Sequence, residues 1–224
     1  MDILNNVIDG ITSTIKGPKD VAIMVILLVI IILSYVLNYY KPEIKGYLGG
    51  KRVFKLLSKL PEDEYSILHN IMLKTKNGTT QIDYVVVSCY GLFIIEVKNY
   101  TGWITGSEYK KEWTQTIYKV KNKFMNPFHQ NYGHVKNIQG LINDETVPVY
   151  SIVAFSDDAE IKFDIKKNTL VYWSELYDTI LEMSKKEVMN KDKMREIVKL
   201  INENNIDSPE ARKEHIENIN NNYY

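Results

Sequence analysis

The chain has 224 residues, enough for one domain of ordinary size with additional segments at its ends. Lysine plus arginine and aspartate plus glutamate both number 28, so the chain has no net charge with histidine neutral. This balance excludes a globally basic nucleic-acid-binding protein, although charges can still segregate locally. The single cysteine, Cys89, excludes an intrachain disulfide and a cysteine-based zinc site, and it fits a reducing compartment.

An uncharged apolar run near the N-terminus predicts a transmembrane helix. Residues 21–40 consist mainly of Val, Ile, Leu and Met, and about 20 such residues cross roughly 30 Å of hydrocarbon. Tyr35, Tyr39 and Tyr40 suit the membrane interface. Residues 1–20 form a leader of mixed charge, and no small-residue cleavage site follows the run. Both features favour a retained span over the alternative, a cleaved signal peptide.

Positive residues around this run predict its orientation. More of them follow the span than precede it: Lys41, Lys45, Lys51, Arg52 and Lys55, against Lys16 and Lys19. Positive residues near the ends of a span favour the cytoplasmic side. We therefore expect a single-pass protein of the cell membrane that contacts the lipid bilayer through residues 21–40, with its C-terminal domain in the cytoplasm.

Two apolar stretches, Gln81–Ser88 and Leu92–Asn99, predict a pair of β-strands joined by a short turn. Both are rich in β-branched and aromatic residues. Because the apolar runs are nearly continuous, we expect both faces of the sheet to be covered. Into this setting the sequence places Asp83, Glu96 and Lys98. Buried charges are costly unless they are paired or bind a metal, which makes these three residues the candidate site.

The register of this hairpin determines how the charges meet. Side chains alternate along a strand, so Glu96 and Lys98 share a face. A turn at Cys89–Tyr90 places Asp83 opposite Glu96, whereas a turn at Tyr90–Gly91 places it opposite Lys98. Directly opposed Cβ atoms lie about 5 Å apart, so two carboxylates there can share one divalent cation. The plainer alternative is a Glu96–Lys98 ion pair on a solvated sheet face.

The rest of the chain predicts further helices and strands. Helices are expected at Gly46–Leu60, Pro127–Ile142, Trp173–Met183, Asp192–Asn204 and Pro209–Ile219. Strands are expected at Tyr65–Lys74, Thr101–Ile104, Trp113–Val120 and Val147–Phe155. Asn77–Gly78 is a strong hairpin signal between the first strand and the apolar pair.

Several short motifs surround the charged hairpin in a specific order. They are Thr80–Asp83, Gly91–Tyr100, Gly102 with Gly106, Trp113, Asn126–Asn131 and Val147–Phe155. Together with Asp83 and the Glu96-x-Lys98 triplet, they resemble the nuclease-related domain (NERD) family of the PD-(D/E)XK nuclease superfamily. The resemblance covers roughly residues 46–176.

This resemblance implies the architecture of the whole chain. The expected fold is an α/β (α+β) mixed sheet, a restriction-endonuclease-like core flanked by helices, in residues 44–180. The transmembrane helix precedes it, and a charged helical tail, residues 181–224, follows. The implied activity is metal-dependent hydrolysis of phosphodiester bonds in nucleic acid, with DNA favoured over RNA.

The resemblance also implies roles for individual residues. Asp83, Glu96, Lys98 and Gln130 are the implied catalytic residues, and Asp83, Glu96 and the main-chain carbonyl of Val97 are the implied ligands of Mg²⁺ or Mn²⁺. Lys98 would position or help deprotonate the attacking water, and its charge relieves the repulsion between the carboxylates.

One position departs from the family pattern. The family motif Gly-x-x-Gly-Glu places a glutamate on the first helix, but Gly46 to Gly49 is followed here by Gly50. Two further hypotheses therefore stand beside the nuclease. One is a catalytically degenerate nuclease fold that binds nucleic acid or protein at the membrane. The other is a membrane-tethered interaction domain with a purely structural role.

Other residues have two interpretations each. Asn126 either caps the helix at Pro127 or binds substrate. His134, one turn after Gln130, either faces the site or is an ordinary hydrogen-bonded histidine. Trp103 and Trp113 either stack on bases or belong to the core. A basic stretch either contacts phosphates or protects a solvated sheet edge: Lys110, Lys111, Lys119, Lys121 and Lys123.

Overall fold

The computed structural model describes residues 17–76 and 78–213. The chain divides into two compact units, Met1–Tyr47 and Leu48–Tyr224, and each is described by itself. Most of the predicted leader, the turn residue Asn77 and the end of the predicted helix Pro209–Ile219 lie outside the described residues.

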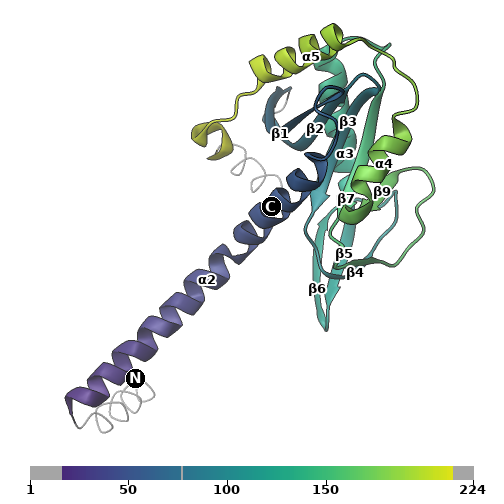
Figure 1. The fold of residues 1–224 in the computed structure, drawn as a ribbon. Helices are drawn as coiled ribbons and strands as arrows, with labels where there is room; N and C mark the ends of the chain where they lie inside the picture. The colour runs from purple at the N-terminus through teal and green to yellow at the C-terminus, as the bar shows by residue number, and fades with distance from the viewer. Residues whose placement is uncertain (1–16, 77, 214–224) are drawn as a thin grey trace. The chain divides into compact units, whose positions relative to one another are not determined.

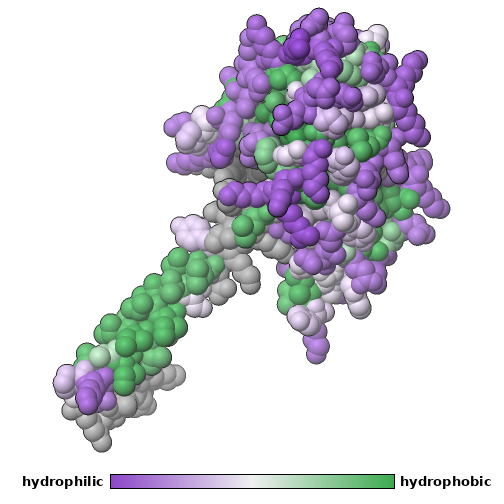
Figure 2. Space-filling view, in the orientation of Figure 1, coloured by the Kyte–Doolittle hydropathy of each residue, from purple (hydrophilic) through white to green (hydrophobic). Residues whose placement is uncertain are grey.

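The first unit contains most of helix α2 (Pro18–Leu57). Its segment Pro18–Leu37 has 20 residues with a mean hydropathy of 2.9, long and apolar enough to cross a membrane. None of these side chains is buried within the chain, and Figure 2 shows the resulting apolar coat. By length and composition the segment is a candidate membrane span.

The second unit is built on a five-stranded mixed sheet with the strand order β1-β2-β3-β7-β9. The strands are β1 (Tyr65–Thr75), β2 (Gly78–Ser88), β3 (Gly91–Lys98), β7 (Val149–Phe155) and β9 (Thr169–Tyr172). The first three pair antiparallel, whereas β7 is parallel to β3 and β9 is parallel to β7. The predicted mixed α/β class is confirmed.

A second sheet has the order β6-β5-β4-β8. Its strands are β4 (Gly102–Thr105), β5 (Glu112–Ile117), β6 (Val120–Met125) and β8 (Ala159–Ile161). The single strand predicted over Trp113–Val120 is wrong, because Ile117 pairs with Val120 around a two-residue turn. Tyr118 in that turn has a φ of 52°, a conformation for which the sequence carries no glycine signal.

Helices cover both faces of the five-stranded sheet (Figure 1). They are α3 (Pro127–Ile142), η1 (Trp173–Glu175), α4 (Leu176–Met183) and α5 (Lys191–Asn204), with the end of α2. Leu92 and Ile94 pack in the layer beneath α3 and α5. Phe93 and Ile95 pack in the opposite layer, with the end of α2 and α4. The prediction that both faces are covered is confirmed.

Helix α5 belongs to this compact unit, although the sequence assigned residues after 180 to a charged tail. Its Met194, Ile197 and Ile201 are buried in the same layer as α3. Asn190 begins the helix by accepting a hydrogen bond from the amide of Lys193 at 2.8 Å.

Candidate functional site

The β2–β3 hairpin has the first of the two predicted registers. Ser88 pairs with Gly91, so the turn is Cys89–Tyr90, and Tyr84 pairs with Ile95. The next pair in this register is Asp83 with Glu96. The hairpin therefore brings the two carboxylate residues to neighbouring strands at the end of the ladder.

Asp83 lies where the β1–β2 ladder is interrupted. The ladder skips Asn70, whose φ is 52°, and Asp83 opposite it. Ile82 and Val85 both pack in the α3 layer although they are three residues apart, so the in-and-out alternation shifts by one residue here. The Asp83 carboxylate bonds to β3 instead, where its Oδ2 accepts a hydrogen bond from the Val97 amide at 2.8 Å.

Glu96 and Lys98 form the centre of the site. Lys98 Nζ lies 2.6 Å from Glu96 Oε1 and donates to Gln130 Oε1 at 3.0 Å. The Glu96 side chain is only 2 % exposed and that of Lys98 is 17 % exposed. The predicted ion pair is thus present, but it is buried beneath α3 rather than on a solvated sheet face. Gln130 is brought to the site as predicted.

His134 completes the contacts of Glu96. Its Nε2 lies 3.2 Å from Glu96 Oε2, and its Nδ1 lies 2.9 Å from Thr80 Oγ1. A ring nitrogen facing a carboxylate donates, so Nε2–H faces Glu96, and in that tautomer Nδ1 is the acceptor for the Thr80 hydroxyl. Both oxygens of Glu96 therefore have a polar partner.

Helix α3 carries three side chains to the site because of how it begins. Asn126 accepts a hydrogen bond from the Phe128 amide at 2.9 Å, and Pro127 occupies the first turn. Gln130 and His134 are four residues apart and share one side of the helix. Between them, Asn131 Nδ2 donates to the carbonyls of Ile94 and Ile152, at 2.9 and 3.1 Å, which fixes α3 to β3 and β7.

The charges of the site perturb one another. Burial and the neighbouring Glu96 raise the pKa of Asp83 to about 7. Burial favours the neutral form of Glu96, but Lys98 and His134 hold its pKa below the ordinary value. Burial likewise opposes the charge on Lys98, yet Glu96 and Asp83 keep its pKa raised. Near neutral pH, Lys98 is an ammonium group, Glu96 is a carboxylate, and Asp83 is close to its titration point.

The oxygen donors at this centre fit a small hard cation. Among residues 17–76 and 78–213, no group of three or more His, Cys, Asp or Glu is arranged to hold a metal ion. Mg²⁺ needs no such cage, because it takes one or two carboxylates and fills its shell with water and phosphate oxygens. Asp83 and Glu96 supply two carboxylates, and Val97 is next to both, because it follows Glu96 in the chain and its main-chain N–H donates to Asp83 Oδ2.

Gly50, at the position of the family's helix glutamate, is not required by packing. A Cβ there would have Tyr84 Oη at 3.8 Å as its neighbour, an ordinary contact. At Gly49, by contrast, a Cβ would lie 2.7 Å from Asn99 Nδ2 and would clash. A Cβ at position 50 therefore meets no steric barrier.

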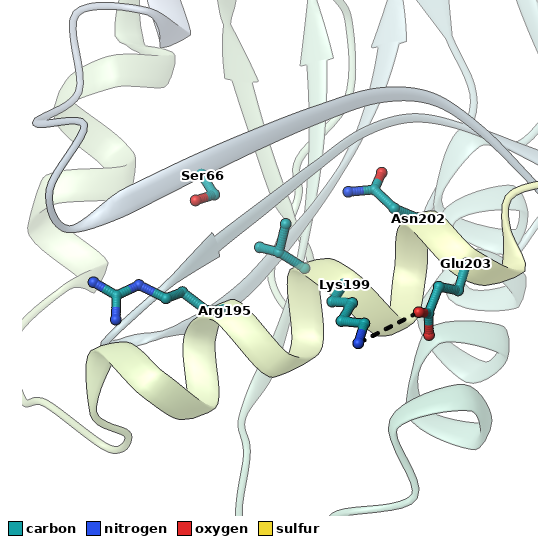
Figure 3. Close-up of a pocket in the computed structure, with 6 residues that line it drawn as sticks. Ser66, Arg195, Lys199, Asn202 and Glu203 are labelled. Carbon is teal, nitrogen blue, oxygen red and sulfur yellow. Dashed lines mark ion pairs between the residues drawn. The ribbon is translucent and has the colours of Figure 1, made fainter.

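The remaining candidates divide between core and surface. Trp113 is fully buried in the core, whereas Trp103 is 55 % exposed with Lys162 Nζ 5.1 Å from its ring centre. Lys110, Lys111 and Lys123 line one hollow together, whereas Lys119 and Lys121 do not line it. A different hollow of about 520 Å³, between β1 and α5, shares no residue with the charged centre (Figure 3).

Sequence reasoning assigned no role to Thr80, Asn131 or Glu108. Thr80 and Asn131 lie in the motifs Thr80–Asp83 and Asn126–Asn131, and this was the feature of the sequence that could have identified them. Glu108 is only 6 % exposed and bonds to a loop some 58–60 residues away, and the sequence carries no signal for that contact.

Two comparisons with known proteins identify relatives of this chain. A family profile described as "Nuclease-related domain" matches residues 45–156. An uncharacterized protein of Bacillus anthracis is 36 % identical over 204 residues, which cover 89 % of this chain and 95 % of the relative. No solved structure matches the chain.

Proposed function

This chain belongs to the nuclease-related domain family, and on that premise we propose that it is a metal-dependent nuclease that hydrolyses phosphodiester bonds of nucleic acid, with DNA favoured over RNA. The observation that carries the proposal is the buried Glu96–Lys98–Gln130 cluster with Asp83 on the adjacent strand. Burying these charges is costly, and a structural role alone does not require two carboxylates at one place.

Asp83, Glu96 and the main-chain carbonyl of Val97 are the residues proposed to hold Mg²⁺ or Mn²⁺. Such a cation, when bound, neutralises phosphate charge and lowers the pKa of a bound water. Its positive charge would also favour the ionised form of Asp83, whose carboxyl is otherwise close to its titration point.

Lys98 is proposed to hold the attacking water and to stabilise negative charge on the phosphate. Because its pKa is raised, it acts as a hydrogen-bond donor and a positive charge rather than as a base. Gln130 fixes the position of the ammonium group, and His134 orients Glu96 through its second oxygen.

The candidate span Pro18–Leu37 supports a membrane anchor for this nuclease. The greater number of positive residues after the span favours a cytoplasmic position for the domain. Cytoplasmic nucleic acid close to the membrane is then the substrate pool.

A catalytically degenerate fold is the second candidate, and one specific observation favours it. Gly50 occupies the position of the helix glutamate, although a Cβ would fit there. In that case the same centre would bind nucleic acid or protein without cutting it.

Cleavage by the full chain in nonionic detergent separates the two candidates. Plasmid DNA and single-stranded RNA are incubated with Mg²⁺, Mn²⁺ or EDTA, and Asp83→Ala and Lys98→Ala are compared with Lys199→Ala, a control on α5. Hydrolysis is expected only with metal, and it should vanish in the first two variants alone. Absence of cleavage by the wild-type chain with either metal would contradict the nuclease proposal.

A further inference from the structure

A basic cleft lies where the β5–β6 hairpin meets the first turn of α3. It has a volume of about 760 Å³, and its polar lining comes from Lys110, Lys111, Lys123 and His129, with Glu112 and Thr114. We propose that this cleft binds the phosphate backbone of a nucleic-acid strand beside the Glu96–Lys98 centre. The inference rests on the proposed nuclease function and adds a substrate-binding surface to it.

The charge of the cleft suits phosphate. Three lysine ammonium groups face one carboxylate, that of Glu112. Glu112 Oε2 lies 3.1 Å from Lys123 Nζ, but both side chains are more than half exposed, and exposed pairs contribute little and exchange easily. Although the whole chain has no net charge, its charges are therefore segregated in favour of an anion here.

The main chain beneath two of these lysines is held firmly. The side chain of buried Asn126 donates from Nδ2 to the carbonyl of Lys110 at 2.7 Å. Its main-chain N–H donates to the carbonyl of Lys111 at 2.8 Å. In the same loop, the Glu108 carboxylate accepts from the amides of Lys167 and Asn168, both at 2.9 Å. A preformed cleft loses less freedom on binding than a flexible loop would.

The cleft adjoins the charged centre through α3. His129 lines the cleft, and the next residue, Gln130, contacts Lys98. Adjacent residues on an α-helix point about 100° apart, so the cleft and the centre lie on neighbouring sides of the same turn of α3. A strand with one phosphate at Lys98 then has its neighbouring phosphates along the cleft.

The lining indicates contact with the backbone rather than with bases. Lysines bind phosphates as point charges, and the described lining of the cleft includes no Phe, Tyr or Trp for stacking. We therefore expect binding that depends little on base sequence and that accepts both DNA and RNA.

Binding of the full chain in nonionic detergent tests the cleft without any cleavage. In EDTA, Kd is measured for a labelled single-stranded DNA and for an RNA of the same sequence over a series of salt concentrations. Lys110→Ala/Lys111→Ala should weaken binding by about tenfold at low salt and reduce the slope of log K against log[salt] by about 1 to 2. Lys123→Ala should reduce this slope by about half as much.

Lys119→Ala/Lys121→Ala is the matched control, because it removes the same amount of charge from the β5–β6 hairpin at residues outside the cleft. Less than about a twofold effect is expected from it. Equal losses in both double variants, loss in neither, or no binding by the wild-type chain would overturn the cleft proposal. A wild-type chain that binds through the cleft but never cleaves with Mg²⁺ would instead overturn the hydrolysis proposal and leave the cleft standing.

Discussion

Glu108 and Asp83 are two carboxylate residues with little access to water, and their pKa values are shifted in opposite directions. Glu108 accepts hydrogen bonds from the amides of Lys167, Asn168 and Lys166, and these donors lower its pKa to about 2. Its charge is satisfied entirely by the chain, and its bonds hold the loop that carries the basic cleft.

Asp83 has one such donor, the Val97 amide, and a carboxylate neighbour in Glu96. Burial and that neighbour raise its pKa to about 7. A carboxylate that the fold itself destabilises is typical of a functional position. The contrast shows that burial alone does not identify a site, because the supply of donors distinguishes a structural carboxylate from one available to a ligand.

Removal of the Lys98 charge should give the largest effect, a loss of cleavage that a change at Glu108 does not cause. Lys98→Met keeps the aliphatic part of the side chain and is expected to lower metal-dependent cleavage by about 10²- to 10⁴-fold. Glu108→Gln should leave the cleavage rate unchanged at temperatures where the protein is folded. Steady-state cleavage assays at 20 °C check both, and an equal loss in Glu108→Gln would break the comparison.

Glu108→Gln should instead lower stability by several degrees in Tm. The Gln side chain would place its own N–H donor against a main-chain N–H that now donates to the carboxylate, and that N–H would lose its acceptor. Because the folded pKa of Glu108 is depressed from 4.5 to about 2, its charge stabilises the fold above pH 4.5, and this contribution is lost as pH falls toward 2. Thermal melts at pH 7 and pH 3 should show the deficit shrinking, and Glu112→Gln, in an exposed ion pair, should show little deficit at either pH.

Asp83→Asn should have the opposite sign. In EDTA at pH 8 it is expected to stabilise the fold by about 1–3 kcal/mol, because Asn still accepts from Val97 but carries no charge. Between pH 3.8 and about 7 the folded protein keeps a proton that the unfolded chain has released. Wild-type stability from this group therefore falls as pH rises through that window. Denaturant titrations at pH 4 and pH 8 check it, and a gain at pH 4 as large as at pH 8 would contradict the raised pKa.

Thr80→Val should produce the smallest effect. It removes the hydroxyl beside His134 Nδ1 without changing side-chain volume. The expected loss is about 1 kcal/mol, or about 2–4 °C in Tm for a domain of this size. Thr105→Val, at an exposed hydroxyl, is the control and should change Tm less.

Local patterns were enough to predict much of this fold and part of the site. The apolar runs flanking Cys89–Tyr90 fixed a hairpin, and its turn left only two registers to consider. Asn126 and Pro127 predicted the first turn of α3, and helical spacing from Gln130 placed His134 on the same side. These features depend on residues close together in sequence, where propensity and periodicity are informative.

Two of the features that were missed depend on contacts between distant segments. The shift in alternation at Asp83 coincides with an interruption of the β1–β2 ladder, where Asn70 on the other strand is also skipped. The loop held by Glu108 lies some 60 residues away. Tyr118 adopts a positive φ in a turn without the usual glycine or asparagine. Tertiary packing overrides local preference at Asp83 and at the loop bonded to Glu108, whereas Tyr118 is 98 % exposed in a local hairpin turn.

Calorimetric titration of Mn²⁺ into the full chain tests most directly whether Asp83 and Glu96 form a cation site. The predicted result is one saturable site in the wild-type chain and in Glu108→Gln, and no binding in Asp83→Asn. Melts of the same samples should show stabilisation of about 2.7 kcal/mol at a cation concentration 100 times Kd. No heat in the wild-type chain, or equal heat in all three proteins, would contradict a cation site at Asp83 and Glu96.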